Sequence, residues 1–237
     1  RVLLAIIVGA ALAVSGTTLQ AMVRNPLADP FLFGISSGAS LAAVIVITLG
    51  SAVVGGLSLS VAAFVGAFLT TFAVFVLAQR NGRVVPMRLA LAGVALSFVL
   101  SSATSFLVMR AAAKGGGNAA AVVLNWLAGS LGGAKWEHLG LPTLVLIVTT
   151  GVLILQSRAL NTLLLGEESA IGLGINVQQF RLQLFFITSL LVGTVVAISG
   201  SIGFVGLLIP HIVRMLVGSD HRRVLPLSAL MGGVYMV

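Results

Sequence analysis

Long stretches without a charged residue restrict the fold of this sequence more than any other feature. Residues 30–79 contain no Asp, Glu, Lys or Arg, and residues 2–23 and 89–109 are equally free of charge. Because an α-helix rises ~1.5 Å per residue, about 20 such residues cross the ~30 Å hydrocarbon core of a bilayer. The chain is 59% hydrophobic and 8% charged, which leaves too little polar surface for a soluble fold. We therefore expect an integral membrane protein.

The apolar runs predict helices, because the alternating ~10-residue segments of a membrane β-barrel are absent. About seven complete or short helices and one partial helix are expected, over 2–23, 35–49, 57–79, 89–109, 139–157, 182–199, 205–217 and from 224 onward. The predicted fold class is an all-α polytopic bundle of transmembrane helices, formed by a single domain over 1–237. Since the chain starts with Arg1 and stops within an apolar run, we expect an internal part of a longer membrane protein.

The basic residues predict the orientation of the helices. If the helices alternate, Arg1, Arg110, Lys114 and Lys135 fall on one side of the membrane. The other side receives Arg24, Arg80, Arg83, Arg88, Arg158, Arg181, Arg214, Arg222 and Arg223. Cytoplasmic loops carry the excess of Lys and Arg, so the larger group is assigned to the cytoplasm and the N-terminus to the outside. Because the basic residues are scattered over helix ends and form no patch, the net charge of +8 does not indicate nucleic acid as a partner.

An internal repeat is visible at an offset of 184 residues. Gly9 matches Gly193, and Gly16 matches Gly200. Further along, Pro26 matches Pro210 and Gly34 matches Gly218. An odd number of crossings separates the copies, so they would be inverted, an arrangement found in many transporters. Chance matches between small residues are the alternative.

Three local patterns have structural explanations. Gly34 and Gly38 form a GxxxG pair, which lets helix backbones pack closely. The segment 125–142 holds both tryptophans and is expected as a short helix along the external face, where Trp anchors a protein at the interface. His211 and Arg214 share a helix face, and a structural role is favoured over a ligand role.

The sequence lacks the groups on which enzymes and metal sites depend. It has no cysteine and no cluster of His, Asp or Glu at metal-ligand spacing. It also has no GxxxxGK[ST] phosphate loop, since Lys114 precedes Gly and Lys135 precedes Trp. We expect no cofactor, no metal and no enzymatic activity, so any ATP hydrolysis would take place in a partner subunit. The uncharged spans favour a passive conduit over an ion-coupled transporter, which usually needs ionisable groups in the membrane.

The stretch RALNTLLLGEESAIGLGIN (158–176) holds two of the five acidic residues. Its leucines predict a short helix with an apolar side, and Gly166 can end that helix. Glu167 and Glu168 then lie in the first turn of a second short helix, where acids suit the helix dipole. Such a helix pair can insert into a groove of a partner or rest on lipid headgroups, and the residues alone favour neither.

Five segments, taken in order, resemble the signatures of the FecCD-type permeases. They are VGAALAVSGTTLQAMVRNPLADPFLFGISSGA (8–39), LALAGVAL (89–96), WLAGSLGGAKW (126–136), LGEESAIGLG (165–174) and ISGSIGFVGLLIPHIVRMLVGSDHRRVLP (198–226). These permeases are the membrane subunits of bacterial ABC importers for iron–siderophores, haem and vitamin B12, and they lie in the cytoplasmic (inner) membrane. The resemblance implies ten helices related by an inverted repeat, of which this chain lacks the first, most of the ninth and the tenth.

The resemblance also implies roles for particular residues. The loop that docks into the ATPase is matched by Leu165, Gly166, Glu167, Glu168, Ala170, Leu173 and Gly174. Asn25 matches a position at the cytoplasmic gate, and Val85, Pro86 and Met87 match the other gate region. Arg1 matches a basic external position that pairs with acidic residues of a substrate-binding protein.

The resemblance implies a permease subunit that moves a ferric siderophore into the cytoplasm by alternating access. The implied partners are two cytoplasmic ABC ATPase subunits, an external substrate-binding protein, a second permease subunit (most simply in a homodimer) and the lipid bilayer. Haem or vitamin B12 is the alternative cargo. An ion-driven secondary transporter or channel is the rival class, and a non-transporting membrane scaffold is the third.

Overall fold

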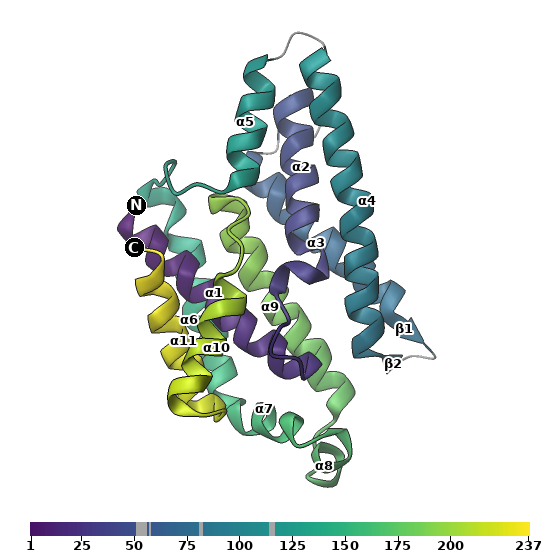
Figure 1. The fold of residues 1–237 in the computed structure, drawn as a ribbon, viewed down its shortest axis with the longest axis vertical. Helices are drawn as coiled ribbons and strands as arrows, with labels where there is room; N and C mark the ends of the chain where they lie inside the picture. The colour runs from purple at the N-terminus through teal and green to yellow at the C-terminus, as the bar shows by residue number, and fades with distance from the viewer. Residues whose placement is uncertain (51–55, 57, 81–82, 114–116) are drawn as a thin grey trace.

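A computed structural model describes residues 1–237 apart from 51–55, 57, 81–82 and 114–116. The helices are α1 (Val2–Val23), η1 (Pro30–Phe33), α2 (Ile35–Leu49), α3 (Leu59–Ala78), α4 (Pro86–Ala113), α5 (Gly117–Ala128), η3 (Trp136–His138), α6 (Gly140–Leu155), α7 (Ser157–Leu164), α8 (Glu167–Gly172), α9 (Val177–Ser199), α10 (Val205–Val217) and α11 (His221–Tyr235). Figure 1 shows their arrangement. The all-α fold class is confirmed. The antiparallel pair of two-residue strands, β1 (Gln79–Arg80) and β2 (Arg83–Val84), was not indicated by the sequence.

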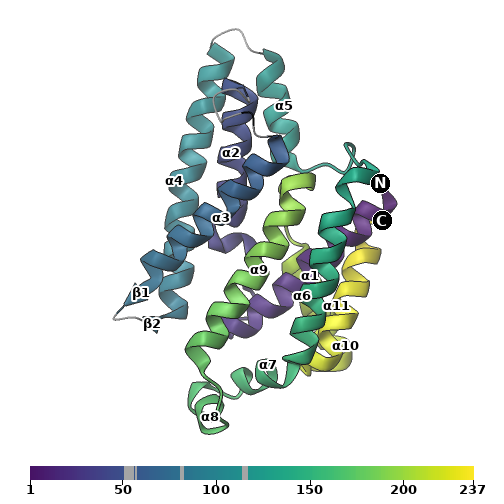
Figure 2. The ribbon, with the colours of Figure 1, turned by 180° about the vertical axis from the view of Figure 1, so that it is seen from behind.

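The central helices α1 and α9 organise the bundle. Within the described residues, five helical segments are long and apolar enough to cross a membrane, and they include α1, α3, α9, most of α4 and η3 with α6. In the most apolar part of α1, 83% of the residues are buried, compared with 67% in α9 and 11% in α4. Figures 1 and 2 show α1 and α9 crossing between α2 to α5 on one side and α6, α10 and α11 on the other.

Glycines let α1 approach its neighbours until the backbones touch. A Cβ on Gly16 would lie 1.8 Å from the carbonyl oxygen of Gly206 in α10. A Cβ on Gly9 would lie 2.0 Å from the carbonyl oxygen of Gly232 in α11. Close contact through small residues is a common packing mode of membrane helices, because lipid tails supply no hydrophobic force between them. The position of α1 therefore depends on residues that have no side chain.

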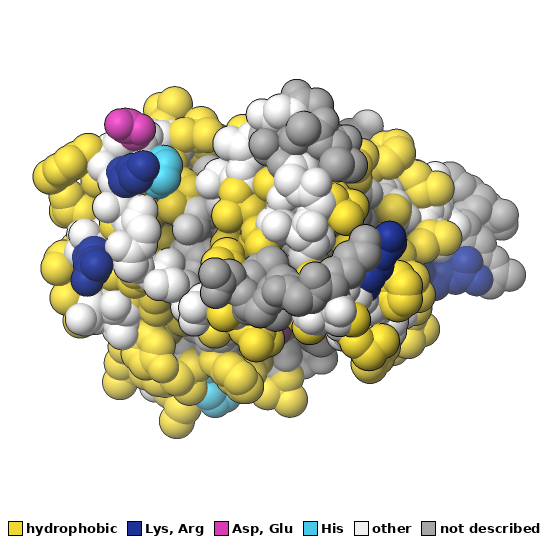
Figure 3. All heavy atoms as spheres, turned by 90° about the horizontal axis from the view of Figure 1, so that it is seen from above, with side chains coloured by type: hydrophobic (Ala, Val, Ile, Leu, Met, Phe, Trp, Pro, Cys, Tyr) yellow, Lys and Arg dark blue, Asp and Glu magenta, His cyan; other side chains and the backbone are white. Residues whose placement is uncertain are grey.

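The helix ends lie at two opposite ends of the bundle, as the positions of the basic residues predict. The lower end in Figure 1 holds the end of α1, the β1–β2 hairpin, α7, α8 and the turn between α10 and α11. The nine arginines assigned to the cytoplasm lie in these elements or in the adjoining ends of α4, α9, α10 and α11, and we call this the arginine-rich end. Seen from the opposite end, hydrophobic side chains dominate the rim and charged ones are sparse (Figure 3). The arrangement agrees with the predicted alternation of the helices.

The directions of the two central helices agree with the predicted inverted repeat. In Figure 1, α1 and α9 run in opposite directions, as inverted copies require. The predicted match of Gly34 with Gly218 does not extend the repeat, because these residues precede α2 and α11, which run in the same direction. The offset of 184 residues therefore applies to the region around Gly9 and Gly193. Beyond this region, the offset between corresponding residues of the two copies is different.

Several predicted boundaries differ from the observed ones. The helix expected over 89–109 continues past Arg110 to Ala113, since alanines favour the helix. The start expected at 182 lies at Val177, because the Asn176 side chain caps α9 by accepting a hydrogen bond from the Gln179 N–H at 3.1 Å. The single helix expected over 125–142 was wrong: α5 ends at Ala128, and a turn at Gly129 (φ 77°) leads to η3.

The remaining local patterns are packing features. A Cβ on Gly38 would lie 2.5 Å from the carbonyl oxygen of Gly66 in α3, as close packing predicts. Gly34 precedes α2 with φ 76° and is no part of a helical GxxxG face. On α10, Arg214 donates from Nη2 to Gln20 Oε1 of α1, a structural contact, while His211 is exposed.

Candidate functional site

Two short helices lie at the arginine-rich end, as the pattern of residues 158–176 predicts. α7 buries Leu160 and Leu163 against the bundle. Gly166 separates α7 from α8 with φ 117°, a conformation that residues with a side chain rarely adopt. Within α8, Ala170 is buried, and Gly174 (φ 82°) follows the helix. This α7–α8 loop connects α6 to α9 (Figure 2).

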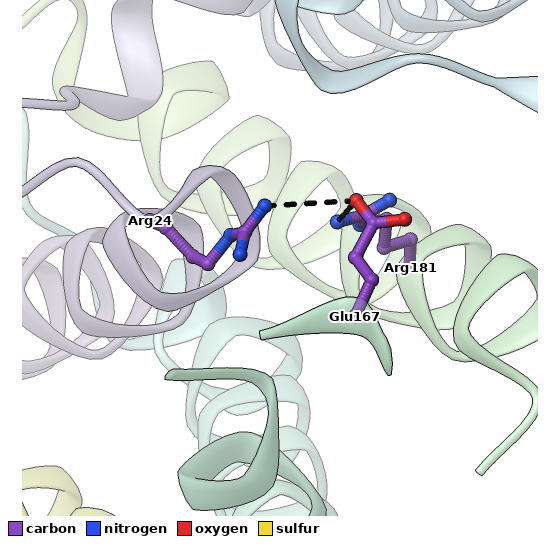
Figure 4. A network of polar contacts seen from close by, with 3 residues as sticks. All are labelled: Arg24, Glu167 and Arg181. Carbon is purple, nitrogen blue, oxygen red and sulfur yellow. Dashed lines mark hydrogen bonds and ion pairs between the residues drawn. The ribbon is translucent and has the colours of Figure 1, made fainter. Parts of the chain in front are cut away.

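Glu167 joins α8 to α9, the next helix along the chain, and to the end of α1, which is far away in the sequence. Its Oε1 accepts a hydrogen bond from Arg181 Nη2 of α9 at 2.5 Å and lies 3.7 Å from Arg24 Nη2 at the end of α1. Figure 4 shows both guanidinium groups directed at the one carboxylate. The Arg181 side chain is 6% exposed, whereas those of Glu167 and Arg24 are 42% and 44% exposed. A single oxygen atom therefore takes part in one largely buried and one surface ion pair.

The local sequence explains why Arg24 is at this position. Asn25 precedes Pro26, and a residue before proline is disfavoured in the helical conformation, so α1 has to end here. Arg24 caps the helix in the left-handed conformation (φ 52°), and the Asn25 N–H donates to the Gln20 carbonyl at 3.1 Å. Non-glycine residues seldom adopt this conformation, and here it belongs to the residue that contacts Glu167.

The electrostatics of the site favour the charged form of Glu167. The hydrogen bond from Arg181 lowers the pKa of Glu167, burial opposes this effect, and the charges of Arg181 and Arg24 lower the pKa further. The carboxylate in turn neutralises a guanidinium that is almost inaccessible to water. Because the Arg181 Nε has no hydrogen-bond partner among the described residues, the contact with Glu167 is the main compensation for burying this charge.

The outer side of the α7–α8 loop is apolar. Leu165 and Leu173 are 73% and 69% exposed, and Ile171 is also exposed. Glu168 is exposed next to them. An open groove of about 490 Å³ runs from Glu167 and Ile171 to Arg181. The residues matched to the docking loop thus divide into an outward apolar group and the inward carboxylate of Glu167.

A second set of contacts attaches α7 to the start of α11. Asn161 Oδ1 accepts hydrogen bonds from the backbone N–H and the Nδ1 of His221, both at 2.8 Å, and Asn161 Nδ2 donates to Asp220 Oδ1 at 2.6 Å. Burial, followed by the charge of Arg214, lowers the pKa of His221 to about 4, so the ring is neutral at pH 7. The loop is therefore fixed at both of its helices.

The residues matched to the gate lie at the same end as the loop. Asn25 is exposed, and its Oδ1 accepts a hydrogen bond from the Leu27 N–H at 2.9 Å, which builds the turn after α1. Val85 and Met87 are exposed at the start of α4, which begins at Pro86. In the described part of the chain, no hydrogen bond joins Asn25 to the 85–87 segment. Arg1 lies at the opposite end, where its Nη2 donates to the Gly132 carbonyl at 3.3 Å.

Two features of the site were missed by the sequence reasoning. Arg24 and Arg181 were used only to orient the helices, and their pairing with Glu167 was not predicted. Asp29 also escaped notice: it lines a cavity of about 430 Å³ with Ser37, Ser97 and Phe204, and its Oδ1 accepts a hydrogen bond from the Phe31 N–H at 2.8 Å. No group of three or more metal-ligating residues occurs in the part of the chain that the structure describes.

Comparison with known proteins gives consistent results. The chain is 43% identical over its full length to the Cobalamin import system permease protein BtuC of Halobacterium salinarum and spans 62% of that relative. It is 41% identical to the Hemin transport system permease protein HmuU of Yersinia pestis, of which it spans 70%. A solved ABC transporter described as of metal-chelate type, in an inward-facing conformation, superposes with a TM-score of 0.90 at 35% identity, over 100% of this chain and 73% of the other.

The family comparison covers the whole sequence. A family model described as the FecCD transport family matches residues 1–237. Together with the long apolar helices, this match places the protein in the inner membrane as a multi-pass protein. The resemblance noted in the sequence is confirmed: the chain belongs to the FecCD transport family.

Proposed function

We propose that this chain is the transmembrane domain, in whole or in part, of the permease subunit of an ABC importer. The permease would work by alternating access, with ATP hydrolysed by separate cytoplasmic subunits. The observation that carries the proposal is the α7–α8 loop, which exposes Leu165, Ile171 and Leu173 at the arginine-rich end while Glu167 fixes it to the bundle. The positive-inside bias puts this end in the cytoplasm, where an ATPase subunit is accessible.

The exposed leucines favour a protein groove over the lipid surface as the environment of the loop. Large apolar side chains that project from a surface in a group usually mark a contact site. Glu168 is exposed beside them, and a carboxylate is disfavoured next to hydrocarbon and anionic headgroups. The groove near Glu167 adds polar surface that a protein partner can fill. We therefore propose that Leu165, Ile171 and Leu173 contact an ATPase subunit.

The relatives narrow the class of cargo. Cobalamin and hemin, named for the two relatives, are both metal ions held by a large organic ligand, and the solved neighbour is described as of metal-chelate type. We propose a metal–chelate cargo, and within that class a ferric siderophore, with haem and vitamin B12 as the alternatives. The cavity lined by Asp29, Ser37 and Ser97 carries few charges, as a pathway for a bulky chelate requires.

The remaining assignments extend the same proposal. Asn25 and the 85–87 segment form parts of the cytoplasmic gate, and Arg1 contacts an external substrate-binding protein. A second permease subunit, in the simplest case an identical one, completes the pathway. α4 is the least buried of the long helices, which agrees with a surface that faces a pathway or a second subunit.

Co-expression of the full-length permease with an ABC ATPase subunit tests the proposal. We expect the two to co-purify in detergent, and replacement of both Leu165 and Leu173 by Ser to reduce the recovered ATPase several-fold. Leu141→Ser, at an exposed leucine near the start of α6 and away from the loop, is the matched control and should leave recovery unchanged. An ion-driven transporter would retain no ATPase, and equal losses for both sets of variants would contradict docking through the loop.

A further inference from the structure

The two ion pairs of Glu167 differ in a way that bears on movement. The contact with Arg181 is 2.5 Å long and involves a side chain that is almost fully buried. The contact with Arg24 is 3.7 Å long, and both side chains are more than 40% exposed. A short pair with a buried guanidinium is costly to separate, because the charge would remain without compensation. A long pair in contact with water separates at little cost.

The two pairs also connect Glu167 to different parts of the bundle. Arg181 belongs to α9, which continues from the α7–α8 loop along the chain. Arg24 ends α1 and is adjacent to Asn25, whose side chain forms the turn after α1. Gly166 lies close to Arg24 as well, since a Cβ on it would be 3.9 Å from Arg24 Nη1. A shift of α8 relative to α1 therefore changes the Arg24 contact first, while the Arg181 contact moves with α8.

The residues that face outward are separate from this network. Leu165, Ile171 and Leu173 are exposed on the loop and take no part in its ion pairs. The loop thus has one surface for a partner and another for its own bundle. Substitutions on the two surfaces are expected to have different effects.

We propose that the Arg24–Glu167 pair is the detachable link through which movement of the α7–α8 loop reaches the turn at residues 24–27, while Arg181 holds Glu167 on α9 throughout. In this scheme Arg24 is a positioning residue, and Glu167 transmits the movement of the loop to it. This inference rests on the proposed function, because it assumes that a nucleotide-driven partner moves the loop.

Arg24→Gln in the full-length permease, in complex with its ATPase subunit, tests the proposal. A cysteine introduced at the exposed Leu27 reports on the turn, and a thiol reagent can be aimed at it because these 237 residues contain no other cysteine. The labelling rate is measured without nucleotide, with ATP and with ADP–vanadate. Arg158→Gln removes an exposed arginine of α7 and is the matched control, while Arg24→Lys keeps the charge.

We expect the labelling rate in the parent protein to change several-fold between nucleotide states. Arg24→Gln should abolish most of this change but retain the ATPase subunit, whereas Arg158→Gln should keep the change and Arg24→Lys should restore much of it. The proposal is overturned if Arg24→Gln responds to nucleotide like the parent, or if the turn does not respond in a parent complex that hydrolyses ATP. Failure of the proposed function itself gives a different result, since no ATPase subunit would then be retained.

Discussion

Gly9→Ala tests whether backbone contact fixes the central helix α1. The new Cβ would lie 2.0 Å from the Gly232 carbonyl oxygen and 2.7 Å from its carbon. Ordinary C···O contacts are about 3.3 Å or longer, so α1 and α11 have to separate by roughly 1 Å. Overpacking of this kind costs about 1–3 kcal/mol. The cost falls on the helix whose end carries Arg24.

Gly151→Ala is the matched control, because Gly151 lies inside α6 and a Cβ there meets no atom within 4 Å. Both substitutions gain roughly 1 kcal/mol of intrinsic helix stability, so the difference between them isolates the contact at Gly9. We expect Gly9→Ala to be less stable than Gly151→Ala by about 1–3 kcal/mol, or roughly 2–4 °C in the unfolding midpoint per kcal/mol.

The measurement is thermal unfolding of both purified variants in the same detergent at one scan rate, since membrane proteins often unfold irreversibly. A midpoint for Gly9→Ala equal to or above that of Gly151→Ala would refute the close contact between α1 and α11.

Three further predictions concern the arginine-rich end. Burial keeps the pKa of His221 at about 4 instead of 6.5, so only the unfolded chain gains a proton between these values. The free energy of unfolding should therefore fall by up to about 3 kcal/mol as the pH drops through this window. In unfolding midpoints measured from pH 7 to 4, His221→Gln should remove this pH dependence. Glu167→Gln should lower the free energy of unfolding by about 1–3 kcal/mol, because it leaves the charge of Arg181 buried without a partner. A double-mutant cycle with Arg181→Gln should show strong coupling between the two residues, whereas additive effects would contradict the ion pair. Gly166→Ala should lower the local stability of α8 by about 1–3 kcal/mol, because residue 166 has φ 117°. Hydrogen exchange in α8 should then be faster. Gly172→Ala is the control, since it has open space around it and should not have this effect.

Most of the fold could be predicted from the sequence, because a membrane leaves few structures open to a long apolar segment. Apolar runs have to be helices, and the ranges 2–23, 35–49 and 205–217 agree with α1, α2 and α10. The prediction failed where charge was taken as a helix boundary. Arg110 and Arg181 both lie inside helices, since an arginine near the end of a span can extend to water or pair with an acid.

The site was predicted only where it depends on local sequence. Local chemistry placed Gly166 between two short helices and Glu167 in the first turn of the second, as observed. The partners of Glu167 are Arg24, at the end of α1, and Arg181, in α9, and no local pattern reports contacts between different helices. The left-handed conformation of Arg24 depends on the proline that follows Asn25 and on cap bonds within α1, so only the structure shows it beside the loop.

Uptake by the reconstituted full-length protein tests the central claim most directly. Proteoliposomes containing the permease, with and without its ATPase subunit, are given a radiolabelled ferric siderophore, haem or cyanocobalamin in the presence of the external binding protein. The proposed function predicts uptake of a metal chelate that requires both the ATPase subunit and ATP and that proceeds without an ion gradient. Uptake by the permease alone, driven by a proton or sodium gradient, would contradict it.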